Sequence, residues 1–297
     1  MTQIFALAFD HRNSLRRGFM HLAGPPTPEQ HATMVAAKGI VTDALIAAAP
    51  QVSPDSPVLL IDHEYGGQFV PEAQARGIRV AMPVEESGQA ELHYLCGGHP
   101  DRIITAYRPD YAKVLIRYNP AGDAAMNARQ RGRLREFSGW LAGRPQQLML
   151  ELLVPPEDAQ LAAVGLDRGR FDRETRAALT VTAIGQIAGD GIRPPLWKIE
   201  GPESRDDAAR IAEAVRSADP DAGCLVLGRG ADGAAVRRWL AIATATPGFT
   251  GFAVGRTIWW DALRDFVDGG DRDAAVQAVA ARYLDLVRDY RALTAAT

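Results

Sequence analysis

Short apolar runs recur along the chain, and longer segments of mixed polarity separate them. Each run has the length and the bulky side chains of a buried strand. One run occurs about every 37 residues, which leaves room for a helix between most of them. This rhythm predicts repeated βα units and a parallel sheet. The eight predicted strands are residues 4–10, 58–62, 78–84, 112–118, 148–154, 196–200, 224–228 and 252–255.

Between these runs, apolar residues recur at helical spacing. Ile211 and Val215 lie four residues apart behind Ser204, which precedes an acidic first turn, and the apolar segment 29–49 predicts another helix. For segment 85–110 we expect a helix followed by a long loop. The last predicted helix has one apolar face, formed by Val276, Val279, Tyr283, Leu286, Val287 and Tyr290.

The strand rhythm continues through the middle of the chain without a linker rich in Pro, Gly or Ser. We therefore expect one α/β domain over residues 1–297, a single (β/α)8 TIM barrel. A doubly wound open sheet is the alternative. It usually has fewer strands, and no GxGxxG motif follows the first strand.

Composition narrows the class of protein. The chain is 47% hydrophobic and 23% charged with a net charge of -3, which argues against disorder and gives little attraction for nucleic acid or an anionic membrane. Cys96 and Cys224 form neither a disulfide framework nor a CxxC metal pair. No signal peptide or uninterrupted apolar run of about 18 residues is evident. We expect a soluble cytoplasmic protein without a membrane or nucleic-acid partner.

Lysine is rare in this chain. Of 33 basic residues only three are Lys, namely Lys38, Lys113 and Lys198. Arg can pair with anions as well as Lys can, but it cannot lose its proton and attack a carbonyl. A Lys that persists among so many Arg therefore suggests chemistry, and two of the three lie inside predicted strands.

Strand alternation places several ionisable side chains inside the predicted barrel. Lys198 shares a strand face with Glu200, Lys113 one with Leu115 and Arg117, and Glu151 one with Met149 and Leu153. Asp10 ends the first strand. Active sites of such barrels lie at the carboxyl ends of the strands, so Lys113, Lys198, Glu151 and Asp10 are candidate catalytic residues. Buried structural ion pairs, Lys113 with Glu151 or Lys198 with Asp10, are the alternative.

Glycine and arginine occur together after the last two strands. Gly228-Arg229-Gly230 follows the seventh, and Gly255-Arg256-Thr257 follows the eighth. The loops after these two strands commonly bind phosphate in such barrels, where glycine admits the anion to backbone N–H groups and Arg adds a forked donor.

The histidines offer a competing interpretation. His11 and His63 follow adjacent strands, beside Asp10, Asp62 and Glu64, and these side chains could hold a divalent metal. No local pair such as HxxxH is present, so we expect no metal or other cofactor. His11 and Glu64 then remain candidate substrate contacts.

Several ordered motifs resemble a known family. They are Phe9-Asp10-His11-Arg12, Leu59-Leu60-Ile61-Asp62-His63-Glu64-Tyr65-Gly66, Lys113-Val114-Leu115, Leu150-Glu151, Trp197-Lys198-Ile199-Glu200-Gly201 and Val254-Gly255-Arg256-Thr257-Ile258-Trp259-Trp260. They resemble the class I aldolase family of tagatose bisphosphate aldolase. The nearest resemblance is to the aldolase-like domain fused to the sugar kinase of some inositol-degradation proteins. Asp10-His11-Arg12-Asn13 stands where tagatose-type enzymes tend to have Asp-Gln-Arg-Gly.

The resemblance implies roles for residues at matching positions. Lys198 corresponds to the Schiff-base lysine, Glu151 to the acid/base carboxylate, Lys113 to a second active-site lysine, and Asp10 to the carboxylate after the first strand. Arg256 corresponds to the phosphate-binding arginine.

The implied reaction is cleavage of a phosphorylated keto sugar or keto sugar acid. The expected substrate is 5-keto-2-deoxygluconate 6-phosphate, which would give dihydroxyacetone phosphate and malonate semialdehyde. Arg12 or Arg117 could recognise a carboxylate or sulfonate at the other end of the substrate. The alternatives are a tagatose, fructose or sulfosugar phosphate, a metal-dependent aldolase, or a catalytically silent sugar-phosphate-binding barrel. A homo-oligomer could form through Trp259-Trp260 and the last helix.

Overall fold

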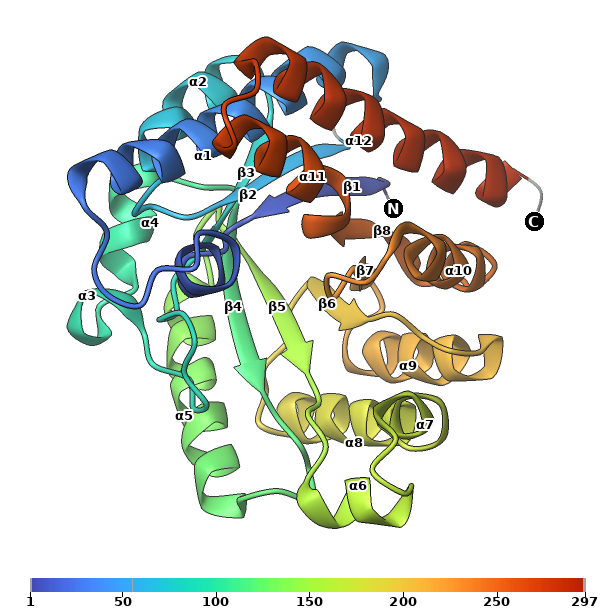
Figure 1. Ribbon diagram of the computed structural model, residues 1–297. Coiled ribbons are helices and arrows are strands. Elements are labelled where there is room, and N and C mark those ends of the chain that lie inside the picture. Colours follow the sequence, from blue (N-terminus) through green and yellow to red (C-terminus); the bar gives the residue numbers. More distant parts are fainter. Residues whose placement is uncertain (1, 55, 296–297) are drawn as a thin grey trace.

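The computed structural model describes residues 2–54 and 56–295, and its strands close into a parallel eight-stranded barrel (Figure 1). Each strand pairs with its neighbours in sequence, and β1 closes the barrel by pairing with β8. The predicted (β/α)8 barrel is therefore confirmed. The strands are β1 (Ile4–Phe9), β2 (Pro57–Ile61), β3 (Arg79–Pro83), β4 (Tyr111–Arg117), β5 (Gln147–Leu153), β6 (Leu196–Glu200), β7 (Gly223–Leu227) and β8 (Phe249–Val254).

Helices surround the strands on the outside of the barrel (Figure 1). They are α1 (Pro28–Ala48), α2 (Val70–Ala75), α3 (Leu95–Gly98), α4 (Asp101–Tyr107), α5 (Ala124–Leu141), α6 (Asp158–Ala163), α7 (Arg168–Glu174), α8 (Arg176–Gly189), α9 (Arg205–Ala218), α10 (Gly233–Thr244), α11 (Arg256–Val267) and α12 (Arg272–Ala295). Single turns of other helix types occur at η1 (Leu15–Phe19), η2 (Ala49–Gln51) and η3 (Gly67–Phe69).

Alternation along the strands separates two apolar layers. In β1, Ala6 and Ala8 face the barrel interior, whereas Phe5, Leu7 and Phe9 face the helices. The interior layer is built from Ile4, Ala6, Ala8, Val58, Leu60, Ala81, Tyr111, Met149, Leu196, Leu225 and Ala253. This layer fills the barrel, so the polar side chains farther along the strands lie above a packed core.

Local sequence explains where the main helices begin. Thr27 and Gln30 form a reciprocal capping box at the start of α1, with Pro28 in the first turn. Ser204 accepts a hydrogen bond from the Asp207 amide and caps α9, as the sequence predicted. The predicted apolar face of α12 is also buried except at Val276, which is partly buried. Tyr283 on this face donates a hydrogen bond to the Phe5 carbonyl of β1 (2.9 Å).

The helix α1 is unusually apolar for an outer helix. The segment Pro28–Gln51 has a mean hydropathy of 1.5 and would be long enough to cross a membrane. Core helices pass the same test, and here the side chains of Met34, Ile40 and Leu45 are buried in the layer between helices and barrel. The helix also packs against α12. Its hydropathy is therefore explained by packing on two sides.

For segment 85–110 the sequence analysis predicted a helix followed by a loop, and this order was wrong. A loop comes first, pinned by a bridge between Glu85 and Tyr94, and the short helices α3 and α4 follow. Pro100 caps the start of α4, and Arg108 ends it in the left-handed conformation (φ 47°). Proline is tolerated at a helix start and disfavours helix before it, so Pro100 and Pro109 bound a helix rather than interrupting a loop.

Of the two tryptophans proposed as a subunit contact, one lies in the core and the other is only partly buried. Trp259 is buried against Phe9, and its indole N–H donates to the Ala8 carbonyl (3.0 Å). Trp260 is partly buried and meets Phe19 edge-on. Trp259 is thus occupied within its own chain.

Candidate active site

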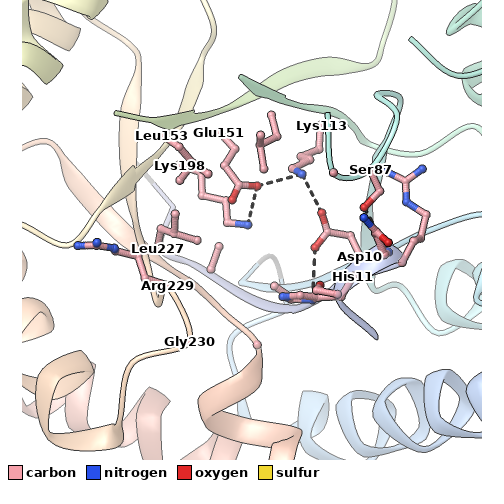
Figure 2. Close-up of a pocket in the computed structure, with 18 of the residues that line it drawn as sticks. Asp10, His11, Ser87, Lys113, Glu151, Leu153, Lys198, Leu227, Arg229 and Gly230 are labelled. Atoms are coloured by element: carbon pink, nitrogen blue, oxygen red, sulfur yellow. Dashed lines mark hydrogen bonds and ion pairs between the residues drawn. The ribbon is translucent and has the colours of Figure 1, made fainter. Parts of the chain in front are cut away.

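A cavity of about 490 Å³ opens at the carboxyl ends of the barrel strands. Asp10 follows β1, Lys113 lies on β4, Glu151 on β5 and Lys198 on β6, and all four side chains line the cavity (Figure 2). Alternation accounts for this arrangement, because it turns the apolar neighbours of each residue toward the helices. The structure therefore brings together the four residues that the sequence placed inside the barrel.

The four side chains form a continuous row of ion pairs (Figure 2). Lys198 Nζ lies 2.9 Å from Glu151 Oε2, and the same oxygen lies 3.0 Å from Lys113 Nζ. Lys113 Nζ also lies 2.8 Å from Asp10 Oδ2. The expected Lys113–Glu151 pair is present. The alternative pair of Lys198 with Asp10 is not, because Asp10 lies beside Lys113 and Lys198 is bound by Glu151.

The charged groups of this row stabilise one another in their ionised forms. Burial lowers the pKa of Lys113, but Asp10, Glu151 and Glu85 outweigh burial and hold that pKa well above its ordinary value. Burial raises the pKa of Asp10 and of Glu151, yet Lys113 and Lys198 outweigh it and keep both pKa values below the usual range. Lys113 therefore stays a cation at neutral pH, and the two carboxylates stay anionic.

Glu85 belongs to the same site, although the sequence analysis did not select it. It follows β3, lines the cavity, and lies with Oε1 2.8 Å from Lys113 Nζ. Its Oε2 is buried without a hydrogen-bond partner, and burial raises the pKa of this carboxyl despite Lys113 and Arg12. The sequence signal for Glu85 was its position just beyond the third predicted strand. Alternation could not orient it, because β3 ends at Pro83.

Glycine and arginine after β7 and β8 form the opposite end of the cavity. Gly228, Arg229, Gly230, Gly255 and Arg256 all line it, and Arg256 donates to the Arg229 carbonyl (2.9 Å). Gly230 has φ of 70°, and a Cβ there would lie 2.3 Å from the Arg256 guanidinium carbon. The two loops are thus in contact, and glycine makes the contact sterically possible.

The two arginines of this end differ in their partners. Arg229 Nη1 lies 2.8 Å from Asp172 Oδ2, and its Nε lies 3.1 Å from Glu200 Oε1. In the described part of the chain, no ion pair to Arg256 is found. Arg256 therefore remains available for an anion, whereas Arg229 is largely neutralised by its own chain.

The histidine cluster proposed for a metal does not assemble. Within residues 2–54 and 56–295, no group of three or more His, Cys, Asp or Glu side chains could hold a metal ion. Asp62 is instead paired with Lys38 (2.5 Å), and Glu64 is exposed and lies outside the cavity lining. The turn after β2 carries Glu64 and His63 away from the cavity that His11 lines. Glu64 is therefore not brought to the site.

His11 lines the cavity as a neutral side chain. Burial lowers its pKa to about 3, against the opposing effect of Asp10. The ring meets Trp259 edge-on with centroids 5.5 Å apart, and Nδ1 has no hydrogen-bond partner. A neutral imidazole in this position can donate or accept one hydrogen bond to a ligand.

Arg12 and Arg117 lie at the end of the cavity near the loops after β1 and β3. Arg12 is buried and donates to the Glu85 carbonyl (2.7 Å). Arg117 donates to the Gln89 carbonyl (2.7 Å). Both predicted residues therefore line the cavity.

Residues 1–294 match the model of a family described as "Uncharacterized protein conserved in bacteria (DUF2090)". The chain belongs to the DUF2090 family. No curated protein matches the sequence significantly.

Several solved structures share the barrel of this DUF2090 member. Cgl0159 from Corynebacterium glutamicum is 19% identical, with a TM-score of 0.56, over 95% of this chain and 86% of that chain. Fructose-bisphosphate aldolase from Plasmodium falciparum is 12% identical, with a TM-score of 0.62, over 98% and 91%. An archaeal fructose-1,6-bisphosphate aldolase, with its catalytic Lys covalently bound to a carbinolamine intermediate, is 13% identical, with a TM-score of 0.56, over 94% and 93%. At these identities the likeness establishes a common fold.

Proposed function

We propose that this DUF2090 protein is a Schiff-base aldolase that cleaves a phosphorylated keto sugar or keto sugar acid. The observation that carries the proposal is Lys198, a buried amine inside the cavity whose Nζ lies 2.9 Å from Glu151. A lysine that forms an imine needs a neighbouring proton acceptor and room for the carbonyl carbon beside its nitrogen, and Glu151 and the cavity would supply these. The fold shared with known class I aldolases supports the proposal.

Imine formation would begin with proton transfer from Lys198 to the adjacent Glu151. The neutral amine attacks the ketone carbon to give a carbinolamine. Protonated Glu151 then returns its proton to the carbinolamine hydroxyl, which leaves as water, so that an iminium forms and Glu151 is again a carboxylate. Lys113 is held as a cation 3.0 Å from Glu151, so it can stabilise the oxyanion that develops during attack. Positive charge is thus available in the site before substrate arrives.

Cleavage would use the iminium as the electron sink. Glu151 removes the proton from the hydroxyl two carbons from the imine, the carbon–carbon bond between them breaks, and an aldehyde leaves. The enamine that remains on Lys198 is protonated at carbon, and water hydrolyses the iminium to release the ketone product. Lys113 holds Glu151 in its anionic form through their ion pair, against the opposing charge of Asp10.

The proposed substrate is 5-keto-2-deoxygluconate 6-phosphate, which cleaves to dihydroxyacetone phosphate and malonate semialdehyde. Its phosphate would lie against Arg256, Gly230 and Gly255, next to the start of α11, where backbone N–H groups favour anions. The motif resemblance and the free guanidinium of Arg256 support this assignment. A panel of ketose phosphates, assayed for release of dihydroxyacetone phosphate, tests the substrate against tagatose, fructose and sulfosugar phosphates.

Borohydride reduction tests the Schiff base directly. Reduction in the presence of dihydroxyacetone phosphate is expected to leave one covalent adduct on Lys198, identified by peptide mass mapping. Lys198→Arg is the matched control, because arginine keeps the charge but does not form an imine at neutral pH. An adduct confined to Lys113 or Lys38, or persistence of the adduct in Lys198→Arg, would remove the assignment.

A further inference from the structure

The main chain at the end of β1 is held by a lysine from a surrounding helix. Phe9 is the last residue of β1 in register with β2. Buried carbonyl oxygens at such a strand end need hydrogen-bond donors from elsewhere. Lys38 of α1 donates to the carbonyl of Phe9 and to the carbonyl of His11 (3.0 Å). One ammonium group therefore binds the carbonyls on both sides of Asp10.

Lys38 is a buried charge that the proposed reaction does not use. The residue is fully buried, and its Nζ lies 2.5 Å from Asp62 Oδ2. The other oxygen of Asp62 accepts a hydrogen bond from the Tyr65 amide (2.9 Å), which closes the turn after β2. A buried ion pair is weak evidence for stability, because desolvation offsets its attraction, but it can fix a specific geometry.

A tryptophan from a different helix holds the same strand end. Trp259 of α11 donates its indole N–H to the carbonyl of Ala8 (3.0 Å). Its ring also packs against Phe9, with centroids 4.2 Å apart, and meets His11 edge-on. The main chain before and after Asp10 is therefore fixed from two helices.

The position of Asp10 matters for the charge of the site. Its Oδ2 lies 2.8 Å from Lys113 Nζ. Burial lowers the pKa of Lys113, and Asp10 is the largest of the charges that reverse this effect. An aspartate side chain has only two torsions, so its carboxylate follows the backbone closely. A displaced strand end would separate Asp10 from Lys113.

We infer that Lys38 is a positioning residue of the active site, which holds the carbonyls on both sides of Asp10 and so keeps the Asp10 carboxylate against Lys113. The inference rests on the proposed function, in which Lys113 stabilises the oxyanion formed when the ketone is attacked. Lys38 lies outside the cavity lining, so it acts through the main chain. Asp62 balances the charge of the buried ammonium.

The rate of imine formation tests this role. The variant Lys38→Met/Asp62→Asn removes both charges together, and timed borohydride quenching measures how fast dihydroxyacetone phosphate forms its adduct on Lys198. The rate at saturation should fall by about 10-fold to 100-fold, because Asp10 and Lys113 lose their alignment. The half-saturating concentration should stay near the wild-type value, since the loops after β7 and β8 are unchanged.

Two comparisons separate positioning from folding. Lys38→Met alone leaves Asp62 unpaired and should be less stable than the double variant, yet both should be equally slow. In an Asp10→Asn background, removing the Lys38–Asp62 pair should change the rate little, because its effect passes through Asp10. Recovery of the rate together with stability in the double variant would overturn the inference, as would equal fold-losses with and without Asp10→Asn.

The variant Arg131→Met/Asp190→Asn is the matched control. Arg131 Nε lies 2.7 Å from Asp190 Oδ2, and this pair joins α5 to the turn after α8, outside the cavity lining. Its removal should leave the rate of imine formation unchanged. An equal loss of rate in the control would show that any broken ion pair slows the site, and would refute a specific role for Lys38.

His11 supplies a readout that needs no aldolase activity. Its ring lies edge-on to Trp259 with centroids 5.5 Å apart, so the ring current of Trp259 shifts its proton NMR signals. These signals, assigned by their loss in His11→Gln, should move toward those of an exposed histidine in Lys38→Met/Asp62→Asn. Unmoved signals would overturn the positioning role. A wild type without a trapped adduct would contradict the aldolase, while the His11 signals still decide the role of Lys38.

Discussion

Three carboxylates meet one ammonium group at Lys113, and Lys198, the proposed Schiff-base lysine, shares the oxygen of Glu151 with it. At the scale of single residues, the proposed chemistry therefore depends on which groups of the site are ionised. Lys113 keeps Asp10 and Glu151 anionic, while Glu85 has the raised pKa of a carboxyl that burial disfavours as an anion. Glu151 is the carboxylate that is both held as an anion and in contact with Lys198, so it is the group placed to accept a proton there.

Replacing Glu151 tests this division of roles. Glu151→Gln keeps the shape of the side chain but cannot accept a proton, so imine formation should slow and cleavage should fall by about 100-fold to 10,000-fold. Borohydride trapping and steady-state release of dihydroxyacetone phosphate measure the two steps separately. Glu85→Gln is the matched comparison. Unchanged turnover in Glu151→Gln together with a collapse in Glu85→Gln would transfer the role to Glu85.

At the scale of elements, α1 is tied to the strands by the remaining lysine. Lys38 is fully buried, lies 2.5 Å from Asp62 after β2, and donates to the carbonyls of Phe9 and His11. These carbonyls flank Asp10. The side chain thus joins one helix to the carboxyl ends of two strands, directly behind the candidate site. Lys38 binds three acceptors that lie close together, the Asp62 carboxylate and the carbonyls of Phe9 and His11. A compact ammonium group fits among them, which explains why lysine occurs here and not arginine with its larger planar guanidinium.

Removing this tie should cost substantial stability. Lys38→Met leaves Asp62 buried and unpaired, which is expected to reduce the free energy of unfolding by about 3–5 kcal/mol. Urea unfolding followed by circular dichroism measures the change. The double variant Lys38→Met/Asp62→Asn should recover part of the loss, because the orphaned charge is gone. A double variant as unstable as the single one would show that Lys38 acts through packing alone.

At the scale of the whole molecule, stability should depend on pH through His11, which is partly buried. Its folded pKa of about 3 lies below that of an unfolded histidine, about 6.5, so the unfolded chain binds the extra proton first. Stability from this group is complete above about pH 6.5 and is lost progressively as pH falls toward 3. The pKa values of Asp10 and Glu151 are lowered in the folded protein, so these groups reduce its stability only when the pH falls below the ordinary pKa of a carboxyl group.

Thermal unfolding between pH 7 and pH 5 isolates the histidine contribution. His11→Gln should show a smaller fall in Tm over this interval than the wild type, because it has no imidazole to protonate on unfolding. His99→Gln is the control, since His99 is exposed beyond α3. An identical fall in Tm for the wild type and His11→Gln would assign the acid sensitivity elsewhere.

The local pattern of the chain was enough to determine the barrel and the interior position of Lys113, Glu151 and Lys198. Alternation has a period of two residues and needs no distant contact, so it orients any side chain within a strand. The same holds for Gly228 and Gly255, which end predicted strands at the edge where barrel sites form.

Tertiary structure decided the rest. Glu85 lies beyond the last pleated residue of β3, so only the loop bridge to Tyr94 orients it toward Lys113. Asp62, grouped with the histidines in sequence, is turned outward to Lys38 on α1. Arg229 and Arg256 occur in similar motifs, yet among the described residues only Arg229 forms an ion pair with a carboxylate from a distant element, Asp172 of α7. Such partners come from elements far apart in the chain, and their meeting depends on how helices and loops pack, which no local periodicity encodes.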